Sequence, residues 1–364
     1  MKTQRTRHMK RRDLLLAGAR LLCFCSLPSI ALAANDRRRE PEWLPEALSM
    51  LADAARAPSS HNTQPWHVEL HERNRWTLRV APGRSLMVVD PDGRERSQSL
   101  GAFIVALEVA AAARGLRLEV TSTTSPDAPI ALHLLPGPRD TSSLGALRRR
   151  RTLRKALAPL ADMQPWLSQL CGKTETARFI AAGTPEAAAI DRATLLATEE
   201  QCKQDGVWHE LARWIRWRPG DVVANPTGIT PQTMELTWLA RRWVEASYSA
   251  DDVLAPAFRT RTLQQTAAQL AEGSGWLVFA TDDNTAHDWR NTGADLMRIW
   301  LEAVPAAVAL HPMSQAVEVT SRRAALESAL GLTHLQMLVR VGRRAYPPET
   351  VSPRLAAHLI SGWR

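Results

Sequence analysis

Cysteine is scarce in this chain of 364 residues, which contains four cysteines. Two of them, Cys23 and Cys25, lie in an apolar stretch near the N-terminus, so Cys171 and Cys202 are left for the rest of the chain. Two residues form neither the disulfide framework of a small secreted domain nor the spaced ligand set of a structural zinc ion. Two interpretations stay open for them: one bridge in an oxidising compartment, or two free thiols.

A nucleic-acid-binding surface is also missing, although the net charge is +9. Residues 1–33 contain seven basic residues and one acidic residue, so +6 of the charge lies there and +3 in the rest. That rest has no RNA-binding motif and no basic stripe interleaved with aromatic residues. We therefore expect no nucleic-acid partner, and the ordinary apolar content of 45% indicates a globular protein.

The hydrophobic run most like a membrane segment, "LLLAGARLLCFCSLPSIALA", follows a basic stretch near the N-terminus. It is short for a membrane span, and both Arg20 and a Ser-Leu-Pro break interrupt it. The basic start, the apolar run and the A-x-A pattern at its end instead predict a signal peptide over residues 1–33, cleaved between Ala33 and Ala34.

Arg11 and Arg12, followed by Asp-Leu-Leu, resemble the twin-arginine signal. We expect export to the periplasm with the twin-arginine translocase as a partner, and a membrane tether if the signal is not cleaved. An ordinary secretory signal is the alternative. The twin-arginine route carries proteins that are already folded, commonly because a cofactor was inserted in the cytoplasm, so this signal is a first indication of a cofactor.

After a polar linker over residues 34–42, the chain contains a first series of helix and strand patterns. Pro58 ends an amphipathic helix, and "WHVELHERNRWTLRVAPG" alternates apolar and polar residues as two paired strands do. The helix that starts near Asp90 is apolar on nearly all sides, which is typical of a buried central helix. The expected elements are a helix at 43–57, two strands within 66–83, the buried helix within 90–116, and strands at 117–124 and 130–137.

A second series starts with the basic, turn-like segment "SSLGALRRRRTLRKALAPL". Its long helix shares a Gly-Ala pair and leucines at helical spacing with the buried helix of the first series. This likeness indicates either an internal repeat or the common composition of Ala-rich amphipathic helices. The expected elements are a strand at 178–183, a helix at 184–201, a Trp-rich then Pro/Gly-rich stretch at 207–232, a strand at 273–283, a long helix at 288–310 interrupted by Pro305, a final strand at 335–342 and an irregular tail at 343–354.

The stretch "RAPSSHNTQPWHVEL", residues 56–70, is the most distinctive local feature of the chain. Its two prolines and its Ser/Asn/Thr cluster do not continue the preceding helix, so it predicts a turn that gathers polar side chains and backbone amides. Part of this stretch, "APSSHNTQPW", resembles the flavin-contacting turn of the nitroreductase family. The segment "RRRTLRK" resembles that family's Arg-Arg-Ser/Thr-x-Arg phosphate-binding motif, and "MLVRVGRRAYPPETVSPR" looks like its C-terminal strand and basic tail.

The order of these motifs, with the turn before the arginines, is similar to the Acg-like branch, in which two nitroreductase halves are fused in one chain. The resemblance implies an α+β nitroreductase-like fold, with a mainly antiparallel sheet and flanking helices in each half. It places the first half at 43–140 and the second at 141–364, with a lid-like insertion near 207–232. We expect a monomer that imitates a dimer and binds one FMN.

Guanidinium groups match phosphate oxygens in pairs, and a cation at the flavin N1 edge raises the flavin's electron affinity. By resemblance, Arg154 is the ring-edge cation, the turn serves the ribityl chain and ring, and "HPMS" brings backbone over N5. Arg354 is the C-terminal phosphate contact, with Arg343 and Arg344 as rivals. The candidate cofactor-binding residues are Ser59, Ser60, Asn62, Gln64, Arg150, Arg151, Thr152, Arg154, Pro312, Met313, Ser314 and Arg354.

Simpler interpretations stand beside these. An arginine run is commonly a solvated face, and such a turn is in some proteins only structural. His61 and His67 are more typical of hydrogen-bonded loop residues than of catalytic ones. Trp208, Trp214 and Trp217 have spacings that suit a buried core or a cover over the flavin. Leu153 replaces the asparagine that is usual in the branch, which affects substrate geometry more than FMN binding.

The resulting hypothesis is an exported FMN-dependent oxidoreductase that passes a hydride or two electrons through flavin N5 to a small electron-poor acceptor. NAD(P)H is a candidate electron donor, although an exported enzyme would not ordinarily meet it. No catalytic side chain is expected, because the flavin carries the chemistry. The alternatives are a protein that sequesters FMN under a lid with little turnover, and a structural protein on a degenerate nitroreductase scaffold.

Overall fold

The structure, a computed structural model, describes residues 40–121, 125–155, 157–344 and 352–363. The predicted signal peptide and most of the predicted linker lie outside these ranges. The chain divides after Pro41 into two units, and the fold described below is that of residues 42–364. Within the described ranges, no helix combines the length and the apolar character that a membrane crossing requires.

One sheet has five strands in the order β3-β4-β2-β1-β9. The two strands expected within 66–83 are confirmed, with Val68 opposite Leu78 in an antiparallel pair. β9 adds to the free edge of β1 in parallel, so the expectation that the strand at 335–342 is the final one is wrong. The strands are β1 (Trp66–Leu70), β2 (Arg75–Val80), β3 (Leu116–Thr121), β4 (Ile130–Pro136) and β9 (Ser361–Trp363).

The other sheet has four antiparallel strands in the order β5-β6-β8-β7. Its strand β7 lies where the sequence predicted the end of a long helix, and that prediction is wrong beyond residue 303. The helix ends there because Pro305 has no backbone N–H to continue the helical hydrogen bonds. The strands are β5 (Ala177–Ala181), β6 (Gly275–Ala280), β7 (Val308–Pro312) and β8 (Leu335–Arg343).

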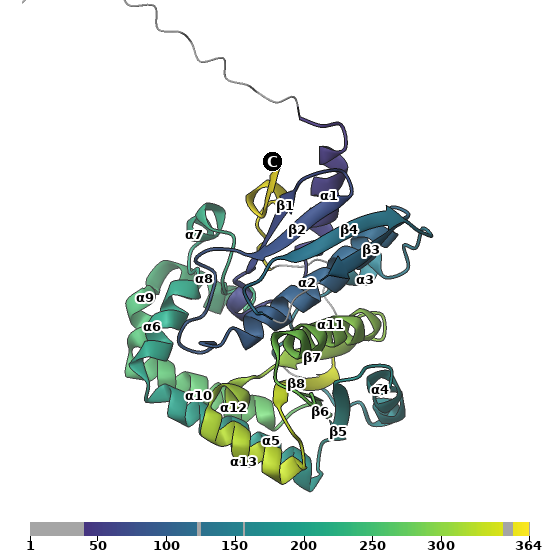
Figure 1. The fold of residues 1–364 in the computed structure, drawn as a ribbon. Coiled ribbons are helices and arrows are strands. Elements are labelled where there is room, and N and C mark those ends of the chain that lie inside the picture. The colour runs from purple at the N-terminus through teal and green to yellow at the C-terminus, as the bar shows by residue number, and fades with distance from the viewer. Residues whose placement is uncertain (1–39, 122–124, 156, 345–351, 364) are drawn as a thin grey trace, which may run out of the picture. The chain divides into compact units, whose positions relative to one another are not determined.

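Two long helices, α2 (Arg94–Ala112) and α11 (Ala286–Ala303), cross between the sheets (Figure 1). They approach closely because each has a glycine at the crossing, Gly101 in α2 and Gly293 in α11. Large side chains such as Trp66, Phe103 and Trp300 are fully buried here, in one core cluster that includes residues of both helices and both sheets. The predicted buried central helix is therefore confirmed, and the mixed α+β class agrees with a nitroreductase-like fold.

The remaining helices surround this centre. The expected helix at 184–201 is confirmed as α5, and the Thr184 hydroxyl caps it by accepting a hydrogen bond from the Ala187 N–H at 3.1 Å. The segment predicted as turn-like at 142–160 begins instead with a short helix, α3. The helices around the centre are α1 (Leu44–Ala54), α3 (Leu144–Arg149), α4 (Gln164–Cys171), α5 (Pro185–Cys202), α12 (Gln315–Glu318) and α13 (Thr320–Leu330), and the 3-10 helices are η1 (Ser60–Asn62), η2 (Ala161–Met163) and η3 (Ala357–Leu359).

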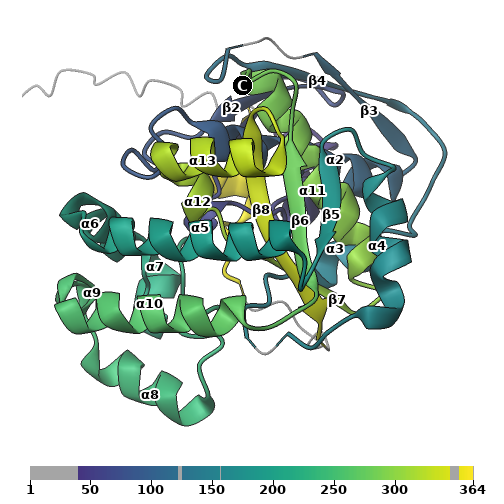
Figure 2. The ribbon, with the colours of Figure 1, turned by 90° about the horizontal axis from the view of Figure 1, so that it is seen from below.

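A helical block lies beside the second sheet, and its helix α10 runs next to α5 (Figure 2). Trp208 and Trp217 are buried in its own small core, and Trp214 is buried as well. Burial of all three tryptophans agrees with the core interpretation, while Trp208 also lines a cavity, so the covering role stays a prediction for it. The block contains α6 (Asp205–Trp214), α7 (Pro219–Ala224), α8 (Trp238–Ser247), α9 (Ala250–Leu254) and α10 (Pro256–Leu270).

Candidate functional site

A cavity of about 310 Å³ lies where the turn, the arginine run and β7 meet. This volume is at the small end of the range for small-molecule sites, about 300–1,000 Å³. Gln64 and Arg151 are the two predicted site residues that do not line it. The predicted residues that do line it are Ser59, Ser60, Asn62, Arg150, Thr152, Arg154, Pro312, Met313, Ser314 and Arg354.

The turn before β1 has a strained backbone. His61, Asn62 and Gln64 adopt φ angles of 48°, 53° and 53°, in the left-handed region that residues other than glycine rarely occupy. The Ser59 hydroxyl supports this conformation by accepting a hydrogen bond from the Gln64 N–H at 3.0 Å. Strain of this kind persists where the surroundings fix it, and it is common at binding sites.

Asn62 joins three separate segments at the wall of the cavity. Its Nδ2 donates to the carbonyl oxygens of Gly228 and Pro353, each at 3.1 Å, and its Oδ1 accepts from the Arg354 guanidinium at 2.8 Å. The backbone repeats the first contact, because the Gly228 N–H donates to the Asn62 carbonyl. Asn62 therefore holds the segment after α7 and the C-terminal segment against the turn.

Gln64 has a supporting position outside the cavity lining. Its side chain is fully buried, with Nε2 donating to the Pro226 carbonyl at 2.8 Å and Oε1 accepting from the Leu355 N–H at 2.9 Å. The amide is thus occupied by the same two segments that Asn62 binds. Its predicted direct contact with a cofactor stays a prediction, and the structure gives it a bracing contact instead.

Arg150 and Arg354 concentrate positive charge beside the turn. Arg150 is 2% exposed, lies 4.6 Å from the Trp300 ring centroid, and donates to the Arg56 carbonyl. Arg354 also donates to that carbonyl, at 3.3 Å. Burial and the charges of Arg150 and Arg56 hold the pKa of the Arg354 guanidinium well below its usual value. An anion bound here would relieve this repulsion, which is the physical requirement for a phosphate site.

The other arginines of the run have different surroundings. Arg154 lines the cavity and donates to the Thr233 carbonyl at 2.7 Å, and burial lowers the pKa of its guanidinium to about 10. Arg151 faces Glu235 instead, at 3.9 Å. Arg148 forms an ion pair with Asp53 at 2.8 Å, away from the cavity lining. The run therefore divides into arginines at the cavity and arginines that neutralise carboxylates.

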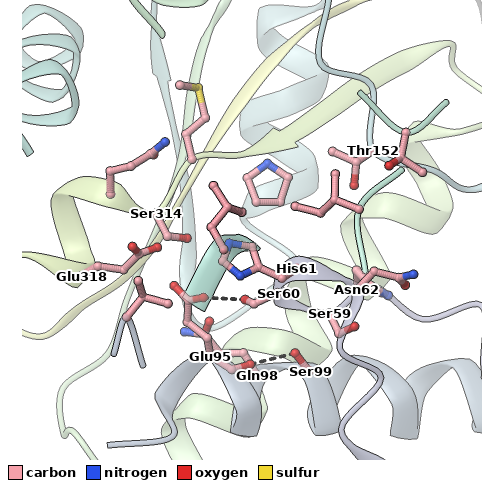
Figure 3. Close-up of a pocket in the computed structure, with 18 of the residues that line it drawn as sticks. Ser59, Ser60, His61, Asn62, Glu95, Gln98, Ser99, Thr152, Ser314 and Glu318 are labelled. Atoms are coloured by element: carbon pink, nitrogen blue, oxygen red, sulfur yellow. Dashed lines mark hydrogen bonds between the residues drawn. The ribbon is translucent and has the colours of Figure 1, made fainter. Parts of the chain in front are cut away.

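The wall opposite the arginine run consists of the end of β7 and the start of α12. Pro312, Met313 and Ser314 line the cavity there, and the Met313 N–H donates to the Leu338 carbonyl at 2.9 Å, which fixes this segment on β8. Figure 3 shows Ser314 and Glu318 on one side of the cavity and Thr152 and Asn62 on the other. Because Asn62 bonds to Arg354, the cavity has a basic end and an acidic end.

Sequence reasoning did not find the acidic end. Glu95 is 5% exposed, accepts a hydrogen bond from the Ser60 hydroxyl at 2.5 Å, and lines the cavity together with Glu318. Gln98 and Ser99 line it as well, from the next turn of α2. The signal was present in "RERSQS", because a run of polar residues at the start of an otherwise apolar buried helix indicates that this end faces a polar site.

Several buried polar atoms of the lining have no hydrogen-bond partner among the described residues. They are His61 Nδ1, Gln98 Oε1, Gln315 Oε1 and Arg354 Nε. Buried polar groups in folded proteins are nearly always satisfied, so a set of orphans around one cavity indicates that a polar ligand completes them. Burial lowers the pKa of His61, which therefore favours its neutral form.

The two remaining cysteines are free thiols in the structure, which answers the open question of their pairing. Burial raises the pKa of the Cys171 thiol to about 11, so it is not a reactive thiolate at neutral pH. Across the described residues, no group of three or more His, Cys, Asp or Glu side chains is arranged to bind a metal ion.

No protein-family model matches the chain. An uncharacterised protein of Mycobacterium tuberculosis (strain CDC 1551 / Oshkosh) is 27% identical over 355 residues, which covers 88% of this chain and 48% of the relative. This chain therefore spans about half the length of that relative. Another uncharacterised protein, from strain ATCC 25618 / H37Rv, is 27% identical over 327 residues, or 84% of this chain and 86% of the relative.

A third relative carries a functional name. A protein of the H37Rv strain named "Putative NAD(P)H nitroreductase" is 27% identical over 309 residues, which covers 81% of this chain and 84% of the relative. This distant similarity supports a relationship to the nitroreductase family and an oxidoreductase activity, in agreement with the resemblance found in the turn and the arginine run.

Proposed function

We propose that this protein is an exported FMN-binding oxidoreductase of the nitroreductase type, which reduces a small electron-poor acceptor. One observation carries the proposal: the polar turn at Ser59–Asn62 and the arginines Arg150 and Arg154, some ninety residues apart in sequence, line a single cavity. The named relative supports the oxidoreductase class.

The residues present fit FMN. The phosphate dianion suits the positive charge of Arg150 and Arg354, since guanidinium groups bind phosphate oxygens in pairs. The hydroxyls of the ribityl chain and the polar edge of the ring suit the orphan atoms of His61 and Gln98. If the phosphate bound at the Arg354 end, Ser314 and the acidic end of the cavity would be left to line the ring.

The chain's own residues bind, orient and shield the cofactor. FMN supplies the hydride chemistry when bound. Arg154 places a cation in the lining, where it favours the negative charge that reduction creates at the ring edge. The hydrogen bonds of Asn62 to Gly228 and Pro353 close two segments over the turn, which excludes water from the cavity.

The same contacts favour a second candidate, an FMN-sequestering protein with little turnover. Gly228 and Thr233 line the cavity, within or next to the predicted lid at 207–232, and bond to Asn62 and Arg154. A ring covered in this way is shielded from a bulky nicotinamide donor. The two candidates share the cofactor and differ in whether electrons enter and leave.

Flavin uptake tests the proposal. The purified protein should carry flavin absorbance, and Arg150→Ala or Arg354→Ala should weaken FMN binding about 10- to 100-fold, the effect of losing a charge-assisted hydrogen bond. Arg148→Ala is the matched control, because this arginine pairs with Asp53 away from the cavity. FMN affinity that is unchanged in both test variants, or a wild-type protein that takes up no FMN, overturns the proposal.

Anaerobic reduction then separates the two candidates. Mixing the yellow protein with NADPH, and afterwards with dithionite, shows whether a nicotinamide reaches the ring. Bleaching by NADPH favours the enzyme, and re-oxidation by a quinone or nitroaromatic establishes the acceptor class. Bleaching by dithionite alone, with no re-oxidation by either acceptor, favours sequestration.

We also propose that residues 43–140 and 141–364 are two nitroreductase halves that form a monomeric pseudo-dimer. The crossing of α2 and α11 supports this proposal. Gly101 of α2 lies against the Arg290 carbonyl of α11, and Gly293 of α11 lies against the Gln98 carbonyl of α2, so the two helices meet through equivalent positions. A monomer in analytical ultracentrifugation is expected, and a stable dimer contradicts it.

Export by the twin-arginine route is likewise proposed, with Arg11 and Arg12 as its signal. A variant with both arginines changed to lysine should stay in the cytoplasm. Continued appearance in the periplasm would assign the segment to the ordinary secretory route.

A further inference from the structure

The acidic end of the cavity is lined by two carboxyl groups. Glu95 comes from the first turn of α2 and Glu318 from the end of α12, and both line the cavity. A hydrogen bond with the Glu95 carboxyl is among the causes that raise the pKa of the Glu318 carboxyl. A hydrogen bond between two carboxyl groups requires a proton, because two carboxylates offer only acceptors. Figure 3 shows the two side chains on the same side of the cavity, with Ser60 beside Glu95.

The contacts of the two groups differ, and the difference locates the proton. Glu95 lies 3.4 Å from the Arg94 guanidinium and accepts from the Ser60 hydroxyl at 2.5 Å. Glu318 accepts from Gln201 Nε2 at 2.6 Å and has no ion pair among the described residues. Burial, followed by the charge of Glu95, raises the pKa of Glu318 well above its ordinary value. These contacts and the raised pKa favour the proton on Glu318, with Glu95 as its partner.

Other charged groups surround the pair. In the segment before α2, burial together with the charge of Glu95 raises the pKa of Asp90 to about 7. On the turn, burial lowers the pKa of His61, and the charges of Glu95 and of Glu210 from α6 act in the opposite direction. Arg94 is the nearby cation, and its Nη1 is held by the Gln336 carbonyl at 2.9 Å. Two carboxyl groups face one nearby cation, Arg94, which favours retention of one proton by the pair.

An independent observation indicates that a polar ligand binds next to this pair. The side chain of Gln98 is 3% exposed and lines the same cavity, one helical turn after Glu95. Its Nε2 donates to the Gln336 carbonyl at 3.0 Å, while its Oε1 has no partner among the described residues. The polar wall that contains Glu95 and Glu318 is therefore incomplete without a bound molecule.

We propose that the Glu95–Glu318 pair is the proton donor for the molecule reduced in this cavity. The inference rests on the proposed flavin-dependent function and adds a catalytic group to it. A quinone that receives a hydride from the reduced flavin becomes a hydroquinone monoanion. The O–H bond of the Glu318 carboxyl then breaks as its proton forms an O–H bond on the second quinone oxygen. Two carboxylates are left, and a proton from solvent restores the pair.

The first test detects the proton itself and needs no flavin. Infrared spectra of the full chain, recorded from about pH 5 to about pH 9, should contain the carbonyl band of a protonated carboxylic acid at neutral pH. Glu318→Gln should remove one such band. Glu108→Gln is the matched control, because burial also raises the pKa of Glu108, which lies on α2 outside the cavity lining. If Glu318→Gln keeps the carboxylic acid bands that the wild type shows at neutral pH, the shared proton is overturned.

The second test measures proton transfer in the flavin-loaded protein. After anaerobic reduction by dithionite, re-oxidation by a quinone should be about 100-fold slower in Glu318→Gln, the usual contribution of a general acid. The wild-type rate should fall as pH rises through the pKa of the pair, and the variant should lack this dependence. Glu108→Gln should keep both the rate and the pH profile.

The outcomes separate the two proposals. If Glu318→Gln binds FMN and retains the wild-type rate and pH profile, the donor role is wrong while the flavoprotein assignment stands. If the wild-type protein binds no FMN, the proposed function fails and the donor role with it, whereas the infrared test still decides the shared proton. Glu95→Gln is the second variant, in case Glu318→Gln does not fold, and it should also lower the pKa of Glu318.

Discussion

The Cα of Gly101 lies so close to the carbonyl oxygen of Arg290 that a β-carbon at this position would be 1.9 Å from that oxygen. The contact has a counterpart, since a β-carbon at Gly293 would be 1.8 Å from the carbonyl oxygen of Gln98. In each case the carbonyl belongs to the residue three positions before the other glycine. The two central helices thus meet through equivalent positions, and backbone atoms that cannot rotate away fill the space beside each glycine.

Alanine at either crossing glycine should destabilise the fold. We expect Gly101→Ala and Gly293→Ala each to lower the free energy of unfolding by about 1–3 kcal/mol or more, as overpacking of a close-packed core does. Urea unfolding followed by circular dichroism measures this. Gly145→Ala is the matched control, because Gly145 lies in α3 with nothing within 4 Å of its β-carbon position, and it should gain up to about 1 kcal/mol of helix stability. Equal effects at all three sites would contradict the close crossing.

Asn62→Ala should loosen both segments that its side chain holds. The variant loses contacts to Gly228, Pro353 and Arg354, so hydrogen exchange of the amides at 226–233 and 352–355 should accelerate. FMN affinity should fall as well, because Arg354 loses its positioning partner. Asn291→Ala, which removes only a surface contact to His287, should leave both measurements unchanged. Exchange rates that match the wild type would show that other contacts hold these segments.

Gly228→Ala tests the cover of the cavity by a different route. Gly228 has a φ of +83°, and a β-carbon there would be 2.2 Å from the Trp214 carbonyl oxygen, so alanine must displace the segment. We expect faster release of bound FMN, measured by the recovery of free-flavin fluorescence on dilution. Gly220→Ala, with open space around the added carbon, is the control. Slower release in Gly228→Ala would contradict a covering role.

Stability should decrease as pH rises from about 4 to about 7. The folded state holds a proton on Asp90 up to about pH 7, whereas the unfolded chain releases it near pH 3.8. The stabilisation from this proton is therefore fully present below pH 3.8 and is lost as pH rises toward 7. The slope is at most about 1.4 kcal/mol per pH unit for one group. Asp90→Asn should flatten this part of the curve relative to the wild type, as measured by urea midpoints across the range. An identical slope in the variant would assign the effect to other carboxyls.

Local pattern was sufficient for most elements. Of the twelve candidate site residues, ten line one cavity, and their binding of a cofactor stays a prediction. The turn and the arginine run have distinctive residue types, and the alternation in β1 and β2 identifies the paired strands. The misses have physical causes. Pro305 was read as an interruption of a helix that in fact ends before it, and the three-residue β9 is too short for a period to be visible.

The roles of individual side chains were harder to predict, because they depend on distant partners. Gln64 belongs to the right motif, but it braces Pro226 and Leu355 instead of facing the cavity. Glu318 was not predicted, because its raised pKa depends partly on Glu95, which lies more than two hundred residues earlier in the chain. Sequence motifs locate a site, whereas the charge state of a group within it is set by neighbours that only the fold brings together.

The parallel pairing of β9 with β1 has a consequence for how the protein is made. A ribosome synthesises β1 nearly three hundred residues before β9. The backbone N–H and C=O groups on one edge of β1 therefore have no strand partner during most of translation. Contacts at such sequence separation also slow folding, since a long loop must close before they form. Until β9 is synthesised, this edge is therefore one at which another chain could pair prematurely.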